Sequence, residues 1–267
     1  MSNIEVSELF IYPVKSCRGI SLNSSEIEPF GLKHDRRWMV VDESGMMITQ
    51  RKKSEMCLIQ PKLVNDGLVL SSASIEDLHV VIPSNNKIKV KVWHDECQAL
   101  DAGDEAAQWF STILSVTCRL VYFSDEEFRQ VDLSYAKKGD KTAFSDGFPL
   151  LLLSQASLDD LNMRLNHPIS IERFRPNIVV KGCEAFAEDA WNKIKINGVE
   201  LRVVKPCSRC VIPSINIETA TREEEPLKTL ATFRKRERKI FFGQNVIGSD
   251  SNETQTIHVD SEVKLLS

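Results

Sequence analysis

The feature that most constrains the fold of this chain is a series of short strand-like segments separated by turns. Segment 87–93 is the clearest, because its lysines alternate with Ile88, Val90 and Val92 and so give the segment one polar and one apolar face. Similar segments recur at 5–12, 38–41, 46–49, 67–71, 78–82, 119–123, 150–153, 178–180, 200–204, 240–246 and 257–266. Helical spacing is found at 104–114, at 157–165 and after Pro226. This pattern predicts a mainly β, α+β fold, rich in β-barrel-like sheets with a few helices.

Local signals add detail to this expectation. The run 150–153 consists of leucines, which predicts a strand buried on both faces. Ser157 with Asp160 has the spacing of a capping box at the start of a helix. Pro206 cannot donate to a strand ladder, so we expect pairing to end there and the chain to leave the loop in an extended form through Pro213.

A polar, charged stretch at 124–141 divides the chain. Several short strands and one helix precede it, and more strands with two helices follow it. We therefore expect two domains, a β-barrel-like domain at 1–123 and a second strand-rich domain at 124–267, each long enough to bury a core.

Composition excludes several classes of protein. The 267 residues carry a formal net charge of −4, which argues against nucleic acid or an anionic membrane as partner. No apolar run approaches the roughly 18 residues that span a membrane. The N-terminus lacks the pattern of a signal peptide, and seven cysteines is an odd number. A cytoplasmic protein with reduced thiols is the expectation.

The most reactive-looking stretch is Pro206-Cys207-Ser208-Arg209-Cys210. Zinc is disfavoured, because there is no second cysteine pair and the histidines are isolated. A redox dithiol, a pair of inert thiols, and a single thiolate that holds a soft metal together with an organic cofactor stay open.

The third alternative also accounts for scattered cations. Arg36 and Arg37 stand at a strand entrance and are expected on opposite faces, whereas Arg173 and Arg175, spaced two apart, are expected on one side. A cationic socket for an anionic cofactor would be formed by Lys15, Arg18, Arg36, Arg173, Arg175 and Arg209.

Six short motifs occur in order along almost the whole chain. They are Ile11-Tyr12-Pro13-Val14-Lys15-Ser16-Cys17, Asp35-Arg36-Arg37-Trp38, Phe174-Arg175-Pro176-Asn177, Pro206-Cys207-Ser208-Arg209-Cys210, Glu225-Pro226-Leu227 and Phe242-Gly243-Gln244-Asn245. Together they resemble the MOSC proteins, the family related to the C-terminal domain of molybdenum-cofactor sulfurases. Within that family the chain is most similar to the mitochondrial amidoxime reducing component and its bacterial YcbX-type relatives.

The resemblance implies an N-terminal MOSC β-barrel-like domain, a MOSC domain and a molybdenum cofactor (molybdenum–molybdopterin). By the same resemblance Cys210 is the molybdenum ligand and the catalytic residue. The cofactor contacts it implies are Lys15, Ser16, Arg36, Arg175, Asn177, Ser208, Arg209 and Asn245. The implied activity is reduction of small N-hydroxylated compounds, such as amidoximes and N-hydroxylated bases, with release of water.

The chain departs from the family at three points. Gly147-Phe148 stands where mitochondrial relatives carry hydroxyl residues, so Ser145 is expected to serve instead. We expect the chain to lack the targeting and anchor segments of the mitochondrial relatives. No cysteine follows Cys210, so no iron–sulfur cluster is expected there and electrons must come from an external donor protein: a flavoprotein reductase, a ferredoxin-type protein or a b-type cytochrome. A cofactor or persulfide carrier without turnover is the alternative.

Overall fold

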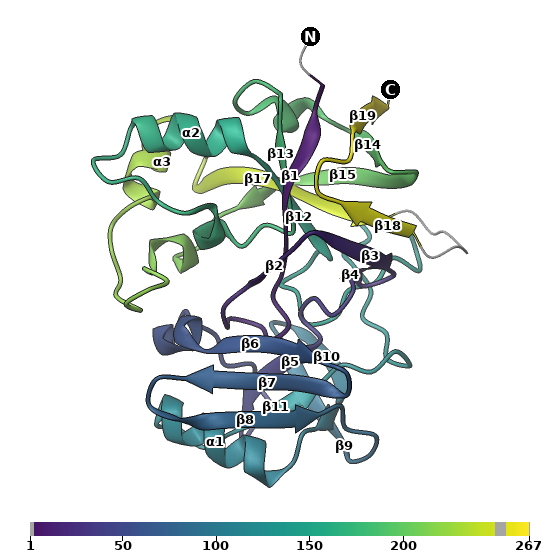
Figure 1. Ribbon diagram of the computed structural model, residues 1–267, viewed down its shortest axis with the longest axis vertical. Helices are drawn as coiled ribbons and strands as arrows, with labels where there is room; N and C mark the ends of the chain where they lie inside the picture. Colours follow the sequence, from purple (N-terminus) through teal and green to yellow (C-terminus); the bar gives the residue numbers. More distant parts are fainter. Residues whose placement is uncertain (1–2, 249–254, 267) are drawn as a thin grey trace.

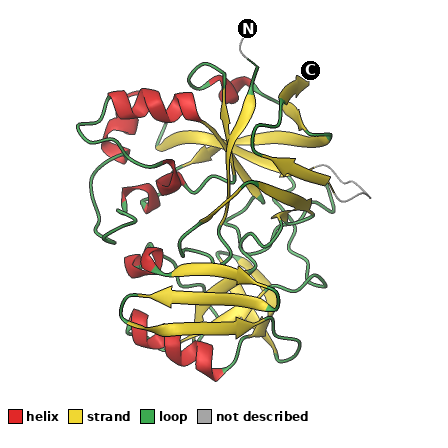
Figure 2. Cartoon of the chain, in the orientation of Figure 1, coloured by secondary structure: helices red, strands yellow, loops and turns green. Residues whose placement is uncertain are grey.

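The computed structural model describes residues 3–248 and 255–266. Two lobes lie one above the other in Figure 1, and strands make up most of both (Figure 2). The mainly β prediction is confirmed. Among the described residues each sheet has an open strand order, so the predicted barrel character does not extend to a closed barrel. No helix in this part of the chain is long and apolar enough to cross a membrane.

The upper lobe is organised by one nine-stranded sheet with strand order β19-β14-β15-β17-β12-β13-β1-β2 and with β16 paired to β17. Its strands are β1 (Glu5–Ile11), β2 (Ile20–Leu22), β12 (Leu150–Ser154), β13 (Ile178–Lys181), β14 (Lys193–Ile196), β15 (Val199–Ser208), β16 (Lys235–Arg236), β17 (Lys239–Gly248) and β19 (Val263–Leu266). The leucine strand β12 lies inside this sheet and is buried along its whole length, as predicted. Since β1 pairs with β13, strands from before and after the proposed division at 123/124 share one sheet, and that division stays a prediction.

Smaller elements cover the large sheet. A three-stranded sheet is formed by β3 (Ser24–Glu28), β4 (Gly31–Leu32) and β18 (Gln255–His258). The helices are α2 (Gln155–Met163) and α3 (Leu227–Phe233), with the 3-10 turns η2 (Ile171–Phe174), η3 (Ala187–Ala190) and η4 (Ile212–Ser214). Leu158, Leu161 and Leu230 of the two helices pack with Phe10 and Phe242 of the sheet in one apolar cluster, because each helix has a single apolar face to bury.

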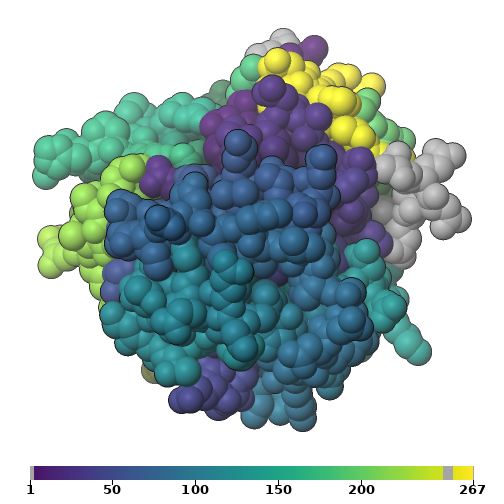
Figure 3. Space-filling view, turned by 60° about the horizontal axis from the view of Figure 1, so that its bottom comes forward, coloured from purple at the N-terminus to yellow at the C-terminus, as the bar shows by residue number. Residues whose placement is uncertain are grey.

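The lower lobe is a sandwich. One sheet contains β5 (Trp38–Asp42), β11 (Cys118–Tyr122), β10 (Asp95–Asp101) and β9 (Lys87–Val92), and the other contains β6 (Gln60–Val64), β7 (Gly67–Ser72) and β8 (Ile75–Val81). Helix α1 (Asp104–Leu114), whose bounds match the prediction, and the 3-10 turn η1 (Ser54–Leu58) complete the lobe. Side chains of both sheets and α1, among them Val40, Leu70 and Phe110, form its core. Seen from below, the lobe presents a continuous surface of close-packed segments (Figure 3).

Several local predictions were wrong, each for a physical reason. Ser154, not Ser157, caps α2, because the strand ends there and its hydroxyl accepts from the amide of Ser157. Pro206 does not end β15, which pairs with β17 as far as Ser208. Since β14 pairs only with the first part of β15, the later residues are open on one side, and proline is tolerated at such an edge.

The remaining differences concern element ends. The residues after the turn at 42–45 form isolated bridges rather than the predicted second hairpin strand. The closing segment 257–266 is divided between β18 and β19. The exit from the cysteine loop is the 3-10 turn η4 rather than an extended segment, so the chain makes a single tight turn directly after Val211.

Candidate functional site

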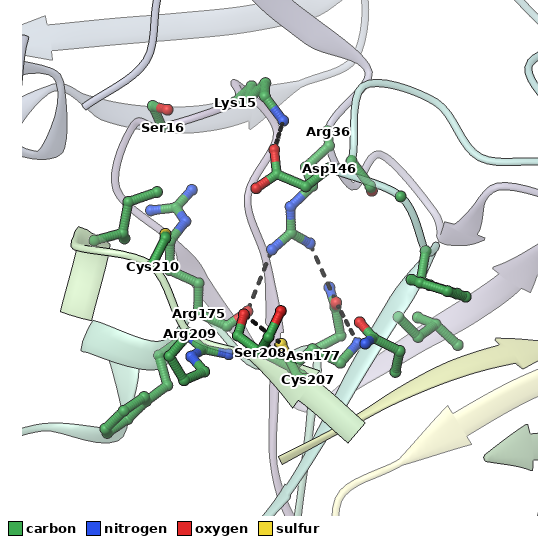
Figure 4. Close-up of a pocket in the computed structure, with 18 of the residues that line it drawn as sticks. Lys15, Ser16, Arg36, Asp146, Arg175, Asn177, Cys207, Ser208, Arg209 and Cys210 are labelled. Atoms are coloured by element: carbon green, nitrogen blue, oxygen red, sulfur yellow. Dashed lines mark hydrogen bonds and ion pairs between the residues drawn. The ribbon is translucent and has the colours of Figure 1, made fainter. Parts of the chain in front are cut away.

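A cavity of about 360 Å³ lies where the two lobes meet. All ten residues predicted as site residues line it: Lys15, Ser16, Arg36, Ser145, Arg175, Asn177, Ser208, Arg209, Cys210 and Asn245. Figure 4 shows Lys15 and Asp146 on one side of the cavity and Cys207, Ser208 and Asn177 on the other, with Arg36 reaching between them. Residues far apart in the sequence therefore share one space. Their roles stay predictions.

The cysteine loop enters the cavity from the end of β15. The backbone amide of Arg209 donates to the carbonyl of Ile240 in β17 at 2.8 Å, which fixes the loop to the sheet. The Arg209 guanidinium donates to the carbonyl of Phe174 at 2.6 Å and approaches the Cys207 sulfur at 3.1 Å. Cys210 directly follows Arg209 in the sequence and also lines the cavity. Guanidinium and thiol groups are thus held together by main-chain contacts.

Arg36 and Arg175 stack on Tyr12. Their guanidinium carbons lie 4.8 Å and 4.1 Å from the ring centre. Arg36 forms an ion pair with Asp35 and donates to the side-chain oxygen of Asn177 at 3.1 Å. Burial is the largest cause that lowers the pKa of Arg175 to about 10, and the positive charge of Arg36 acts in the same direction, whereas Tyr12, Cys17 and Asp35 act to raise this pKa. The site therefore holds two guanidinium groups close together at a free-energy cost.

Backbone conformation directs several of these side chains. Ser16, Arg36, Trp93 and Arg175 all have positive φ angles, of 75°, 49°, 58° and 57°, and all line the cavity. Non-glycine residues adopt this left-handed conformation rarely and at a cost, which the surrounding structure must offset. Its repetition around one cavity is typical of a functional site.

The lower lobe closes the cavity with an ion-pair group. Lys15 donates to Asp146 at 2.5 Å and to the carbonyl of Phe144 at 2.7 Å, and Arg51 donates to the other oxygen of Asp146 at 2.6 Å. Burial lowers the pKa of Lys15 to about 8, although Asp146 opposes that shift. Burial also acts to raise the pKa of Asp146, but the charges of Lys15 and Arg51 outweigh it and hold this pKa far below its usual value.

The predicted socket needs correction at two positions. Arg18 donates to the carbonyl of Ile217 at 2.7 Å and pairs with Glu218, and Arg173 pairs with Glu223 at 2.6 Å. Neither lines the cavity. Arg173 and Arg175 do not share a side, because the segment is a 3-10 turn ending in a left-handed residue rather than an extended strand.

Arg36 and Arg37 do diverge as predicted. Arg37 is buried away from the cavity, where it donates to the carbonyl of Phe123 at 2.6 Å and to Asp125 at 2.7 Å.

Sequence reasoning missed several lining residues. Gln50, Arg51, Trp93 and Asp146 all face the cavity. The guanidinium carbon of Arg51 lies 4.7 Å from the centre of the Trp93 ring. Burial acts to lower the pKa of Arg51, but the interactions with Asp146 and then with Cys210 outweigh burial and raise this pKa. Asp146 directly follows Ser145, which was predicted as a site residue, so the position of Ser145 could have pointed to Asp146. Trp93 had none, because it was assigned to a strand and lies instead in the tight turn between β9 and β10.

The donor set fits an anionic cofactor that carries a metal. Three buried nitrogen atoms of lining residues have no hydrogen-bond partner within the described part of the chain: Arg175 Nη2, Arg209 Nε and Gln50 Nε2. Buried donors are normally satisfied, so these indicate a missing acceptor. Among the described residues no three His, Cys, Asp or Glu side chains gather to hold a metal ion. A metal at Cys210 would therefore take its other ligands from the cofactor.

Comparison with known proteins adds a family signal. The family model "MOSC N-terminal beta barrel domain" matches residues 3–117, and "MOSC domain" matches residues 139–264. Mitochondrial amidoxime-reducing component 1 of Mus musculus is 40% identical over 86% of this chain and 71% of its own length. Its Homo sapiens counterpart is 38% identical over 98% of this chain and 82% of its own length. Mitochondrial amidoxime reducing component 2 of Bos taurus is 38% identical over 86% of this chain and 72% of its own length.

Proposed function

Since the chain belongs to the MOSC family that includes the mitochondrial amidoxime-reducing components, we propose that it is an oxidoreductase that reduces N-hydroxylated compounds at a molybdenum cofactor. The observation that carries this proposal is the position of Cys210. Its thiol group shares the cavity with five cationic side chains, Lys15, Arg36, Arg51, Arg175 and Arg209. A thiol beside this much positive charge suits a soft metal whose other ligands belong to an anion.

The chain's own residues divide into a metal ligand and a set that holds the cofactor. Cys210 would bind molybdenum. The anionic part of the cofactor would be held by the cations Lys15, Arg36, Arg175 and Arg209 and by the polar groups of Ser16, Ser145, Asn177, Ser208 and Asn245. When bound, the cofactor supplies two-electron redox chemistry, while the protein supplies binding and orientation.

The proposed reaction breaks the N–O bond of the substrate. An amidoxime takes up two electrons and two protons, and gives an amidine and one molecule of water. The electrons would come from a separate donor protein, of the flavoprotein, ferredoxin or b-type cytochrome class. Lys15 is a candidate to hold one of the protons near the cavity, because its lowered pKa of about 8 lies close to neutral pH.

The place of action is part of the proposal. The relatives are named as mitochondrial proteins, whereas for this chain we propose a cytoplasmic location.

A cofactor or sulfur carrier is the second candidate. Cys207 favours it, because a second thiol lines the same cavity and the Arg209 guanidinium lies 3.1 Å from its sulfur. Such a protein would bind the cofactor or hold a persulfide but would not reduce N-hydroxylated compounds.

Two matched substitutions test the proposal. In protein made by a cofactor-competent host, Cys210→Ser should remove molybdenum, measured by mass spectrometry of the metal, and should lower benzamidoxime reduction with reduced methyl viologen by roughly 1,000-fold. Cys207→Ser should keep most of both. Circular dichroism should show that both variants are folded. Molybdenum without turnover in the unsubstituted protein would favour the carrier, and a requirement for Cys207 instead of Cys210 would overturn the ligand assignment.

A further inference from the structure

The most basic stretch of the chain is the hairpin Arg234-Lys235-Arg236-Glu237-Arg238-Lys239, here called the basic hairpin. Five of its six side chains are cationic, in a chain with a net charge of −4. It joins β16 to β17, with Lys235 opposite Ile240 and Arg236 opposite Lys239. The fold therefore concentrates positive charge at one tip of the large sheet.

Three of these cations have no ion-pair partner among residues 3–248 and 255–266. Arg234 and Arg236 both bind Asp189, at 2.6 Å and 3.2 Å. Lys235, Arg238 and Lys239 are exposed, and no carboxylate in the described part of the chain pairs with them. Exposed cations without partners create a field that attracts an acidic protein surface.

The nearest acidic run along the chain does not cancel this charge. Glu223 pairs with Arg173, and Glu224 pairs with Lys228, so other cations already offset these two carboxylates. The third, Glu225, accepts from the backbone amide of Thr229 at 3.0 Å and is paired with no cation of the hairpin among the described residues. The one acidic side chain within the hairpin is Glu237, at its turn.

The basic hairpin borders the cysteine loop directly. Ile240, the residue after Lys239, accepts the hydrogen bond from the Arg209 amide at 2.8 Å, and Phe241 is paired with Ser208. The path from Lys239 to Cys210 consists of one residue step along each chain segment and one strand spacing, which together come to roughly 12 Å. A protein docked on the hairpin would hold its redox centre near the cavity.

We propose that the basic hairpin is the docking surface for an acidic face of the electron-donor protein. The inference rests on the proposed function, which needs two electrons from outside the chain in each turnover. Two reduced one-electron donors would dock in succession, each would lose one electron, and the pair of electrons with two protons from water would cleave the substrate N–O bond. Nucleic acid is a poorer fit, because the cationic stretch is six residues long and belongs to an acidic protein.

The test uses an acidic plant-type [2Fe–2S] ferredoxin as the probe. Its affinity for the molybdenum-loaded protein is measured by calorimetry at low and at high salt, and turnover of benzamidoxime is measured with reduced ferredoxin and, separately, with reduced methyl viologen. The double variant Arg238→Glu/Lys239→Glu should weaken ferredoxin binding and kcat/KM by about tenfold or more at low salt. The difference should shrink at high salt. Turnover with methyl viologen should not decrease.

The matched control is Lys62→Glu, compared with the single variant Arg238→Glu. Lys62 is an exposed cation on β6 of the lower lobe, and the change in charge is the same. It should leave ferredoxin binding within about twofold. The proposal would be overturned if Lys62→Glu and Arg238→Glu lost the same amount of affinity for ferredoxin, or if ferredoxin showed no salt-dependent binding to the unsubstituted protein.

A third outcome is tighter binding of a DNA oligonucleotide than of ferredoxin, lost in the same hairpin variants. It would assign the hairpin to nucleic acid and overturn the proposal. Loss of turnover with methyl viologen in the unsubstituted protein would count against the proposed function instead, because ferredoxin binding is measured independently of it.

Discussion

The cationic side chains on the two sides of the cavity have different kinds of partner. On the unpaired side, Arg175 and Arg209 donate to the backbone carbonyls of Cys17 and Phe174 and have no carboxylate partner among the described residues. On the paired side, Lys15 and Arg51 both bind Asp146. A guanidinium bonded to a neutral carbonyl keeps its full positive charge, whereas the negative charge of Asp146 offsets one of the two positive charges of Lys15 and Arg51. The unpaired side should therefore dominate anion binding, and the paired side should tune it.

The largest expected effect separates the two sides. Arg175→Gln should lower the molybdenum content of the purified protein by roughly 100-fold, the upper end of the range for a lost charged hydrogen bond, whereas Arg51→Gln should lower it by less than about tenfold. Arg173→Gln is the control for burial, because Arg173 is buried and ion-paired outside the cavity. Metal analysis after gel filtration gives the result. Equal losses for Arg175 and Arg51 would erase the distinction between the sides.

The next effect has the opposite sign. Asp146→Asn removes the charge that offsets Lys15 and Arg51, so sulfate should bind the cofactor-free protein about tenfold more tightly. Calorimetric titration with sulfate measures this. Asp125→Asn is the control, since it removes an exposed carboxylate paired with Arg37 instead. Weaker sulfate binding in Asp146→Asn would mean that this carboxylate mainly positions the cations.

A smaller effect concerns pH. The pKa of Lys15 is lowered to about 8, so its ammonium group loses its proton as the pH rises through that value. The pKa of Asp146 is held far below this range, so the carboxylate stays ionised throughout. The affinity for sulfate should therefore fall a few-fold as the pH rises from about 7 to 9, because the Lys15 ammonium group loses one proton over this range. Lys15→Arg should flatten the profile, and an unchanged profile in that variant would assign the titration to another group.

The smallest effect concerns the substrate. Phe148 lines the cavity, and its ring lies 6.1 Å from that of Tyr135. Phe148→Ser should raise KM for benzamidoxime about threefold, the size of one aromatic contact, and should leave KM for acetamidoxime unchanged. Steady-state kinetics with both substrates decides the matter. A parallel change for both would indicate that Phe148 shapes the loop rather than contacting a ring.

The grouping of the predicted residues around one cavity could be foreseen from the sequence motifs that carry the family resemblance, and their roles stay predictions. The cationic pairs show the limit of spacing arguments. Because side chains two apart on a strand point to the same face, the sequence predicted Arg173 and Arg175 on one side. The segment is instead a 3-10 turn with a left-handed end, which separates the two side chains. Arg51 lies in a segment without a motif, and it meets Cys210 only because the lower lobe packs against the cysteine loop.

The sequence by itself determined the strand-rich architecture, the bounds of α1, the buried leucine strand and the set of motif residues around Cys210. These depend on side-chain alternation, helical spacing and short motifs, which are properties of neighbours along the chain. The tertiary structure alone decided which cations are paired and which are left with full charge. That outcome depends on left-handed backbone at Arg175 and on the approach of Asp146 and Arg51 from different segments, and neither can be read from neighbouring residues.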